Sequence, residues 1–132
     1  THGTQVTTAH GHLAFYGAYV LLVISMIYVT LPAIRGVKEY NPSRAYLSFW
    51  WMTISMVFIV LTITGAGMVQ TYMERLMGLD YVAVKTIYNM WFWIIRAIFG
   101  VGFLVGVAIF VYDFFKLGKE PAPALSPAEQ KA

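Results

Sequence analysis

The sequence contains no cysteine. This absence excludes disulfide bonds, iron–sulfur clusters held by thiolates and a covalently attached c-type haem on this chain. Charge is also scarce, since Asp, Glu, Lys and Arg make up 11% of the 132 residues and hydrophobic residues make up 59%. Such a composition is typical of a membrane protein rather than of a soluble domain. The net charge of +3 forms no basic stripe of the kind that binds nucleic acid, so no nucleic-acid partner is expected.

The chain begins at Thr1 rather than at methionine. Its first residues carry neither the basic segment nor the small-residue cleavage site of a signal peptide. They have instead the character of the middle of a loop, so we expect the chain to be a piece of a longer protein.

Three apolar stretches are long enough to cross about 30 Å of hydrocarbon, which takes about 20 residues of helix. The first reaches Ile34, and Pro32 and the Arg35-Gly36 pair mark its end as helix-stop signals. The second begins at Asn41 and Pro42, because asparagine caps helices and proline fits the first helical position. The third begins after Asp80, a candidate N-cap, and stops before Gly118. We therefore predict an all-α membrane protein with three transmembrane helices.

The distribution of Lys and Arg predicts how these helices are oriented. Basic residues gather in the first loop and towards the C-terminus, at Arg35, Lys38, Arg44, Lys116, Lys119 and Lys131. An excess of basic residues marks the cytoplasmic side, so the first helix is predicted to run from outside to inside. The predicted segments are an outer loop (1–8), a membrane helix (9–35), a cytoplasmic loop (36–41), a membrane helix (42–74), an outer loop (75–81), a membrane helix (82–117) and a disordered cytoplasmic tail (118–132).

The motif His10-Gly11-His12 stands at the mouth of the first apolar stretch. Each residue of an α-helix advances by about 100°, so the two imidazoles point about 200° apart. They can hardly share one metal ion, and no third ligand for a zinc site lies nearby. Each can bind a separate iron, because imidazole is a common axial ligand of haem. Interfacial histidines that bond headgroups or neighbouring helices are the competing interpretation, and the residues alone leave both open.

The run from Thr1 to Tyr19, THGTQVTTAHGHLAFYGAY, closely resembles part of the large subunit of cytochrome c-dependent nitric oxide reductase, a member of the haem–copper oxidase superfamily. That part is the tenth transmembrane helix and its preceding loop. The stretches 65–70 and 93–96 are similar, more loosely, to the last two helices of the same subunit. The resemblance implies that the chain is a fragment of a twelve-helix bundle. It also implies a multi-pass protein of the bacterial cytoplasmic membrane, with a cytoplasmic C-terminus.

The resemblance implies specific roles for the histidines. His10 matches the proximal ligand of the high-spin active-site haem, and His12 matches an axial ligand of the low-spin haem, both of b type. His2 matches a histidine near the propionates of the active-site haem. No catalytic residue is assigned to this chain, because the ligands of the non-haem iron lie outside it. In this family two nitric oxide molecules, two electrons and two protons yield nitrous oxide and water.

The implied partners are the remainder of the large subunit, a cytochrome c subunit that donates electrons, and membrane lipid. An oxygen-reducing terminal oxidase of the same superfamily is the nearest alternative, and a quinol-dependent reductase is a further variant. The superfamily shares the two histidines, whereas the Gly11 spacer and the residues that follow it favour the nitric oxide enzymes. A haem-free membrane scaffold is the alternative from a different class.

Other residues have a packing and a functional interpretation. Arg96 would cost about 2.5–3.5 kcal/mol at a membrane centre, so we expect it to reach outward, to pair with a carboxylate or to bind a haem propionate. Phe15, Tyr16 and Tyr19 are candidates to pack on haems. The small residues predicted to let helices pack closely are Gly65, Gly67, Gly100, Gly102 and Gly106.

Overall fold

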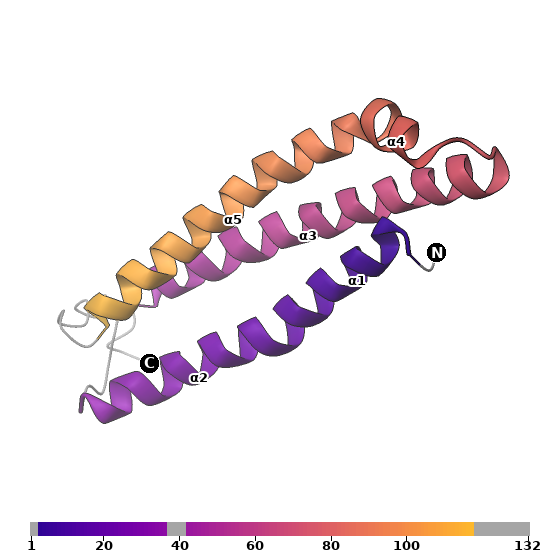
Figure 1. Cartoon of the computed structure of the whole chain (residues 1–132). Helices are drawn as coiled ribbons and strands as arrows, with labels where there is room; N and C mark the ends of the chain where they lie inside the picture. The colour runs from indigo at the N-terminus through magenta and orange to yellow at the C-terminus, as the bar shows by residue number, and fades with distance from the viewer. Residues whose placement is uncertain (1–2, 37–41, 118–132) are drawn as a thin grey trace, which may run out of the picture.

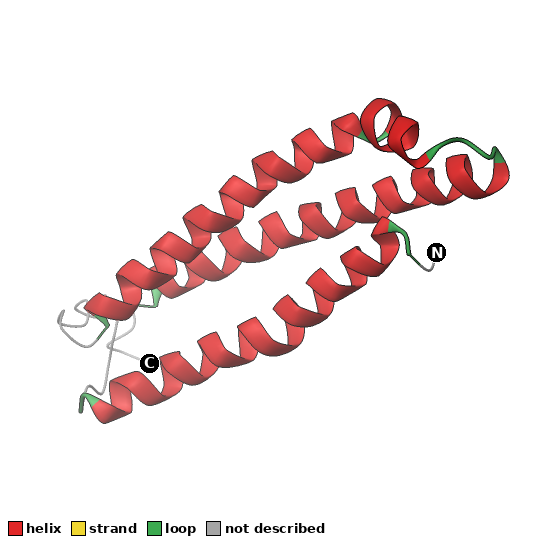
Figure 2. Cartoon of the chain, in the orientation of Figure 1, coloured by secondary structure: helices red, strands yellow, loops and turns green. Residues whose placement is uncertain are grey.

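The computed structural model describes residues 3–36 and 42–117, and every secondary-structure element in these ranges is helical (Figure 1; Figure 2). The elements, with η for a π-helical segment, are α1 (Gln5–Ala14), η1 (Phe15–Val20), α2 (Leu21–Ile34), α3 (Ser43–Thr71), η2 (Tyr72–Leu76), α4 (Tyr81–Ala83), η3 (Val84–Tyr88) and α5 (Met90–Lys116). Three helices are long and apolar enough to cross a membrane: Gln5–Ile34, Ser43–Leu76 and Met90–Lys116. The predicted all-α architecture with three candidate membrane helices is confirmed for these residues.

The first long helix starts at Gln5 rather than at residue 9. The side-chain oxygen of Gln70 accepts a hydrogen bond from the Gln5 backbone N–H at 3.1 Å. This bond satisfies one of the amides that a helix N-terminus leaves without an internal partner, and so extends the helix. At the other end, Gly36 adopts a positive φ of 68° and its N–H bonds to the carbonyl of Ala33. The predicted stop at Gly36 is thus confirmed, whereas Pro32 lies inside α2 and does not end the helix.

The second long helix begins at Ser43, directly after Pro42. The proline therefore precedes the first helical residue, and the predicted cap Asn41 lies outside the described residues. The helix continues to Leu76 through the π-helical segment η2, so it ends two residues beyond the predicted boundary at 74.

The third apolar stretch is interrupted near its start. The predicted cap is confirmed, because the Asp80 carboxylate accepts a hydrogen bond from the Val82 N–H at 2.9 Å. The short segments α4 and η3 follow, and the long helix α5 begins only at Met90. Asn89, between them, has φ −98° and ψ 0°. The prediction of one continuous helix over 82–117 is therefore corrected at Asn89, and Gly118 lies outside the described residues.

Small residues bring α3 and α5 into close antiparallel contact. A Cβ added at Gly106 would lie 3.0 Å from the Met52 backbone nitrogen, and the Ser48 hydroxyl donates a hydrogen bond to the Gly106 carbonyl at 3.0 Å. A Cβ at Gly102 would lie 2.9 Å from the Ser55 hydroxyl. The predicted packing role is thus confirmed here, as it is at Gly65 and Gly67, whereas Gly100 has no described atom within 4 Å of its added Cβ.

The first long helix contacts this pair at one end and diverges from it further along (Figure 1). The backbone of α1 lies against α3 at Gly67, where an added Cβ would be 2.4 Å from the Val6 nitrogen. Ala9 is buried there with Ile59 and Ile63. Beyond this contact an apolar groove of about 440 Å³ separates α2 from α5; its lining includes Val23, Ile27, Val107 and Phe110.

Candidate functional site

His10 and His12 both lie within the regular α-helical segment α1, before the π-helical turn η1 begins at Phe15. Regular geometry places their side chains about 200° apart around the helix axis. The His12 side chain is half-buried, whereas His10 is exposed. The structure therefore places the two predicted ligands on one rigid element and on different sides of it.

A hydrogen bond fixes which nitrogen of His12 can bind a metal. Its Nδ1 lies 2.9 Å from the backbone carbonyl of Thr8, one turn earlier. A carbonyl oxygen can only accept, so Nδ1 carries the proton and donates it. In the neutral ring Nε2 then keeps its lone pair, which is the arrangement that iron-binding histidines use.

The helix surface around the histidines is uncovered on more than one side. Gly11, Ala14, Gly17 and Ala18 are exposed, and a Cβ added at Gly11 or Gly17 would meet no described atom within 4 Å. A large flat macrocycle could therefore approach the backbone closely. The donor set and the open surface both fit haem as the group to be bound.

The aromatic residues after the motif divide into two groups. Phe15 and Tyr19 are exposed and their ring centroids lie 5.3 Å apart, so both stay available to a bound group. Tyr16 is buried; its hydroxyl bonds to the Thr53 hydroxyl at 2.8 Å and its ring meets Phe103 edge-on. The suggested contact between Tyr16 and a haem is thus wrong for this structure, because the ring anchors the helix to α3 and α5.

Of the two remaining predicted residues, the structure describes Arg96 but not His2. His2 lies outside the described residues. Arg96 is half-buried, and its guanidinium lies over the Trp93 ring, 5.2 Å from the centroid. Among the described residues no cluster of three or more His, Asp or Glu side chains could hold a metal ion. Iron bound at His10 or His12 would need its other ligands from the macrocycle or from another part of the protein.

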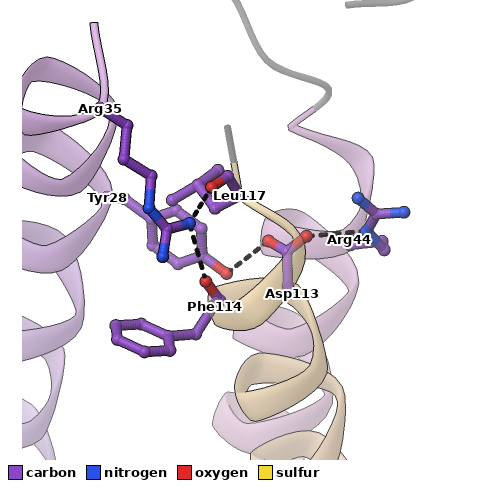
Figure 3. Close-up of polar contacts among 6 residues, drawn as sticks. All are labelled: Tyr28, Arg35, Arg44, Asp113, Phe114 and Leu117. Atoms are coloured by element: carbon purple, nitrogen blue, oxygen red, sulfur yellow. Dashed lines mark hydrogen bonds and ion pairs between the residues drawn. The ribbon is translucent and has the colours of Figure 1, made fainter. Parts of the chain in front are cut away.

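Sequence reasoning passed over Asp113, the most buried charge of the structure's described part (Figure 3). Its side chain is 0% exposed; one oxygen accepts from Arg44 Nε at 2.7 Å, and the other accepts from the Tyr28 hydroxyl at 2.8 Å. The Arg35 guanidinium donates to the Leu117 carbonyl beside them. These contacts join all three long helices. A lone carboxylate near the end of an apolar stretch was the signal that could have revealed them.

Comparison with known proteins identifies the family. The family model described as cytochrome c and quinol oxidase polypeptide I matches residues 1–117. The chain belongs to this family. The resemblance to the haem–copper oxidase superfamily is thereby confirmed.

Two curated relatives cover nearly the whole chain. A nitric oxide reductase subunit of Stutzerimonas stutzeri is 40% identical over 136 residues, which is 97% of this chain and 28% of the relative. A cytochrome c oxidase subunit 1 homolog of Azorhizobium caulinodans is 28% identical over 142 residues, which is 98% of this chain and 26% of the relative. The chain therefore spans about a quarter of the length of each relative. No solved structure matches it.

Proposed function

We propose that this chain is part of the large subunit of a nitric oxide reductase and supplies one axial ligand to each of two b-type haems. His10 binds the high-spin haem at the active site and His12 binds the low-spin haem. The observation that carries the proposal is the diverging pair on α1, with the His12 Nδ1 proton donated to the Thr8 carbonyl so that Nε2 keeps its lone pair for a metal.

The reaction proposed for the complete enzyme joins two nitric oxide molecules with two electrons and two protons to give nitrous oxide and water. The haems, when bound, carry the electrons and present the iron at which nitric oxide is reduced. The contribution of α1 is to position the two haems relative to each other. One helix holds both ligands, which are separated by about 3 Å along its axis. A continuous helix keeps the relative placement of the two ligands fixed, and so gives the electrons a short, rigid path.

Residues outside this chain complete both sites in this proposal. They supply the non-haem iron ligands and the second axial ligand of the low-spin haem. A cytochrome c subunit delivers electrons, and the protein lies in the bacterial cytoplasmic membrane with its C-terminus in the cytoplasm. His2 serves near the propionates of the active-site haem. The excess of basic residues at the α2–α3 end supports this orientation.

Two alanine variants of the complete complex test the assignment of the ligands. We expect His12→Ala to abolish the low-spin haem signal in absorbance and electron paramagnetic resonance spectra while the high-spin signal persists. His10→Ala should disturb the high-spin signal instead. The matched control is Ser25→Ala, because the exposed Ser25 hydroxyl bonds, within the described part of the chain, only to a carbonyl of its own helix. Full spectra and full turnover in both histidine variants would contradict the proposal.

An oxygen-reducing oxidase is the second candidate, and the 28% identity to the cytochrome c oxidase subunit 1 homolog supports it. The higher identity to the nitric oxide reductase relative, 40%, favours nitric oxide chemistry. The purified complex, reduced and supplied with each gas in turn, distinguishes the two. We expect nitrous oxide to form from nitric oxide at half the rate of nitric oxide consumption. Rapid oxygen consumption without nitrous oxide formation would favour the oxidase.

A further inference from the structure

The polar side chains where α3 and η2 meet η3 and α5 enclose a small cavity of about 10 Å³. Gln70, Glu74, Lys85, Asn89 and Trp93 contribute to its wall. Glu74 is half-buried and Lys85 is exposed, whereas Asn89 is only 3% exposed. The cavity therefore lies between the protein surface and a buried amide.

Two residues of this wall carry buried polar atoms that have no hydrogen-bond partner among the described residues. These atoms are Asn89 Oδ1, an acceptor, and Trp93 Nε1, a donor. The Trp93 backbone N–H bonds to the Asn89 carbonyl at 3.2 Å, so the two residues are one helical turn apart. Both atoms are buried within the described part of the chain. Buried polar groups rarely stay unpaired, and a bound water is the usual explanation when protein partners are lacking.

The orientation of the Asn89 amide is fixed. Its Nδ2 donates a hydrogen bond to the Ala66 carbonyl on α3 at 3.3 Å. A flipped amide would set Oδ1 against that carbonyl, two acceptors facing each other. Oδ1 therefore needs a separate donor, and the cavity that Asn89 lines offers space for one.

The chemistry of the two atoms selects the ligand. A cation would suit Asn89 Oδ1 but would meet the N–H of Trp93, and an anion would suit Trp93 but would meet Oδ1. Water suits both, because it accepts one hydrogen bond while it donates another. The size agrees as well, since about 10–15 Å³ is the smallest space that holds one water molecule.

We propose that one internal water molecule binds here, accepting a hydrogen bond from Trp93 Nε1 and donating one to Asn89 Oδ1. Its remaining hydrogen and lone pair face the Glu74 and Lys85 side of the cavity. Gln70 already bonds to Glu74 at 3.0 Å and to the first turn of α1. The water thus closes a polar network that ties the start of α5, at its Asn89 interruption, to α3 and α1.

The test uses the complete protein and does not depend on its enzymatic activity. A high-resolution map should show an ordered peak within hydrogen-bond distance of both atoms. The infrared spectrum should contain a water O–H stretching band that shifts when H₂¹⁸O replaces ordinary water. We expect this band to disappear in Trp93→Phe and in Asn89→Leu, and to persist in Trp91→Phe, where the replaced indole is exposed.

Three results would overturn the proposal. One is a map in which Asn89 Oδ1 and Trp93 Nε1 bond to each other directly. Another is a map in which a side chain fills the cavity. The third is an ¹⁸O-sensitive band that survives both cavity variants. The map comes from the unmodified protein. It therefore tests the proposal even if one of the variants fails to fold.

Discussion

The two ends of the first long helix are held in opposite ways. At the α1 end the contact is close and mostly uncharged: Gly67 lets the backbone at Val6 approach, and the Gln70 amide bonds to the Gln5 N–H. At the α2 end the helices stand further apart and long side chains bridge them, around Asp113 (Figure 3). Between the two ends lies the apolar groove of about 440 Å³.

The difference matches what each end has to do. Backbone contact at a glycine leaves little freedom, so it positions α1, which carries the histidine pair, within narrow limits. Charged side chains span longer distances and belong near a membrane edge, where burying them costs less than at the bilayer centre. The histidine end is thus fixed by shape and the far end by charge.

The largest expected effect is at the charged end. Arg44→Met leaves the fully buried Asp113 without its 2.7 Å ion-pair partner, and breaking a buried pair costs about 3–5 kcal/mol. The thermal unfolding midpoint of the complex should fall markedly, whereas Arg75→Met, at an exposed arginine, should leave it nearly unchanged. The double variant Arg44→Met/Asp113→Leu should regain most of the loss, because the uncompensated charge is removed with its partner. Equal midpoints for the two arginine variants would show that the pair contributes little.

A smaller effect is expected at the end fixed by shape. Gly67→Ala inserts a methyl group where the Val6 nitrogen would lie 2.4 Å away, and overpacking of this kind costs about 1–3 kcal/mol. The midpoint should drop less than in Arg44→Met. Gly100→Ala is the matched control, since its added Cβ meets no described atom within 4 Å. If both alanine variants were equally stable, close packing would not be what holds α1.

The smallest effect is expected from a single hydrogen bond at the charged end. Tyr28→Phe removes the 2.8 Å bond to Asp113 and keeps the ring. Hydrogen bonds between membrane helices contribute about 0.6 kcal/mol on average, so the midpoint should shift only slightly. Tyr46→Phe, at an exposed tyrosine, should not shift it. A loss as large as that of Arg44→Met would mean that the Tyr28 hydroxyl stabilises the complex as much as the Arg44–Asp113 ion pair does.

Much of the fold could be predicted from sequence. The helix stop at Gly36 and the cap at Asp80 follow from local chemistry, and both are confirmed. The interruption at Asn89 could not be predicted from periodicity, because the apolar pattern continues through it. The π-helical turn after the histidines was not predicted either; Tyr16, which lies in it, bonds to Thr53 on α3.

In the candidate site, too, some features follow from the local sequence and others depend on how the helices pack. The spacing of His10 and His12 predicts that they diverge, because helical geometry alone sets the angle. The bond that His12 Nδ1 donates to the Thr8 carbonyl is also local, one turn away. Asp113 was missed because its partners Arg44 and Tyr28 are 69 and 85 residues distant in sequence. Only the packing of three helices brings them together.

The central claim is that each imidazole of the pair binds its own haem iron. An experimental density map of the complete protein tests this most directly. We predict two iron atoms on opposite sides of α1, one bonded to a ring nitrogen of His10 and one to Nε2 of His12. A map in which either ring binds no iron, or in which both rings turn to one shared metal, would contradict the account.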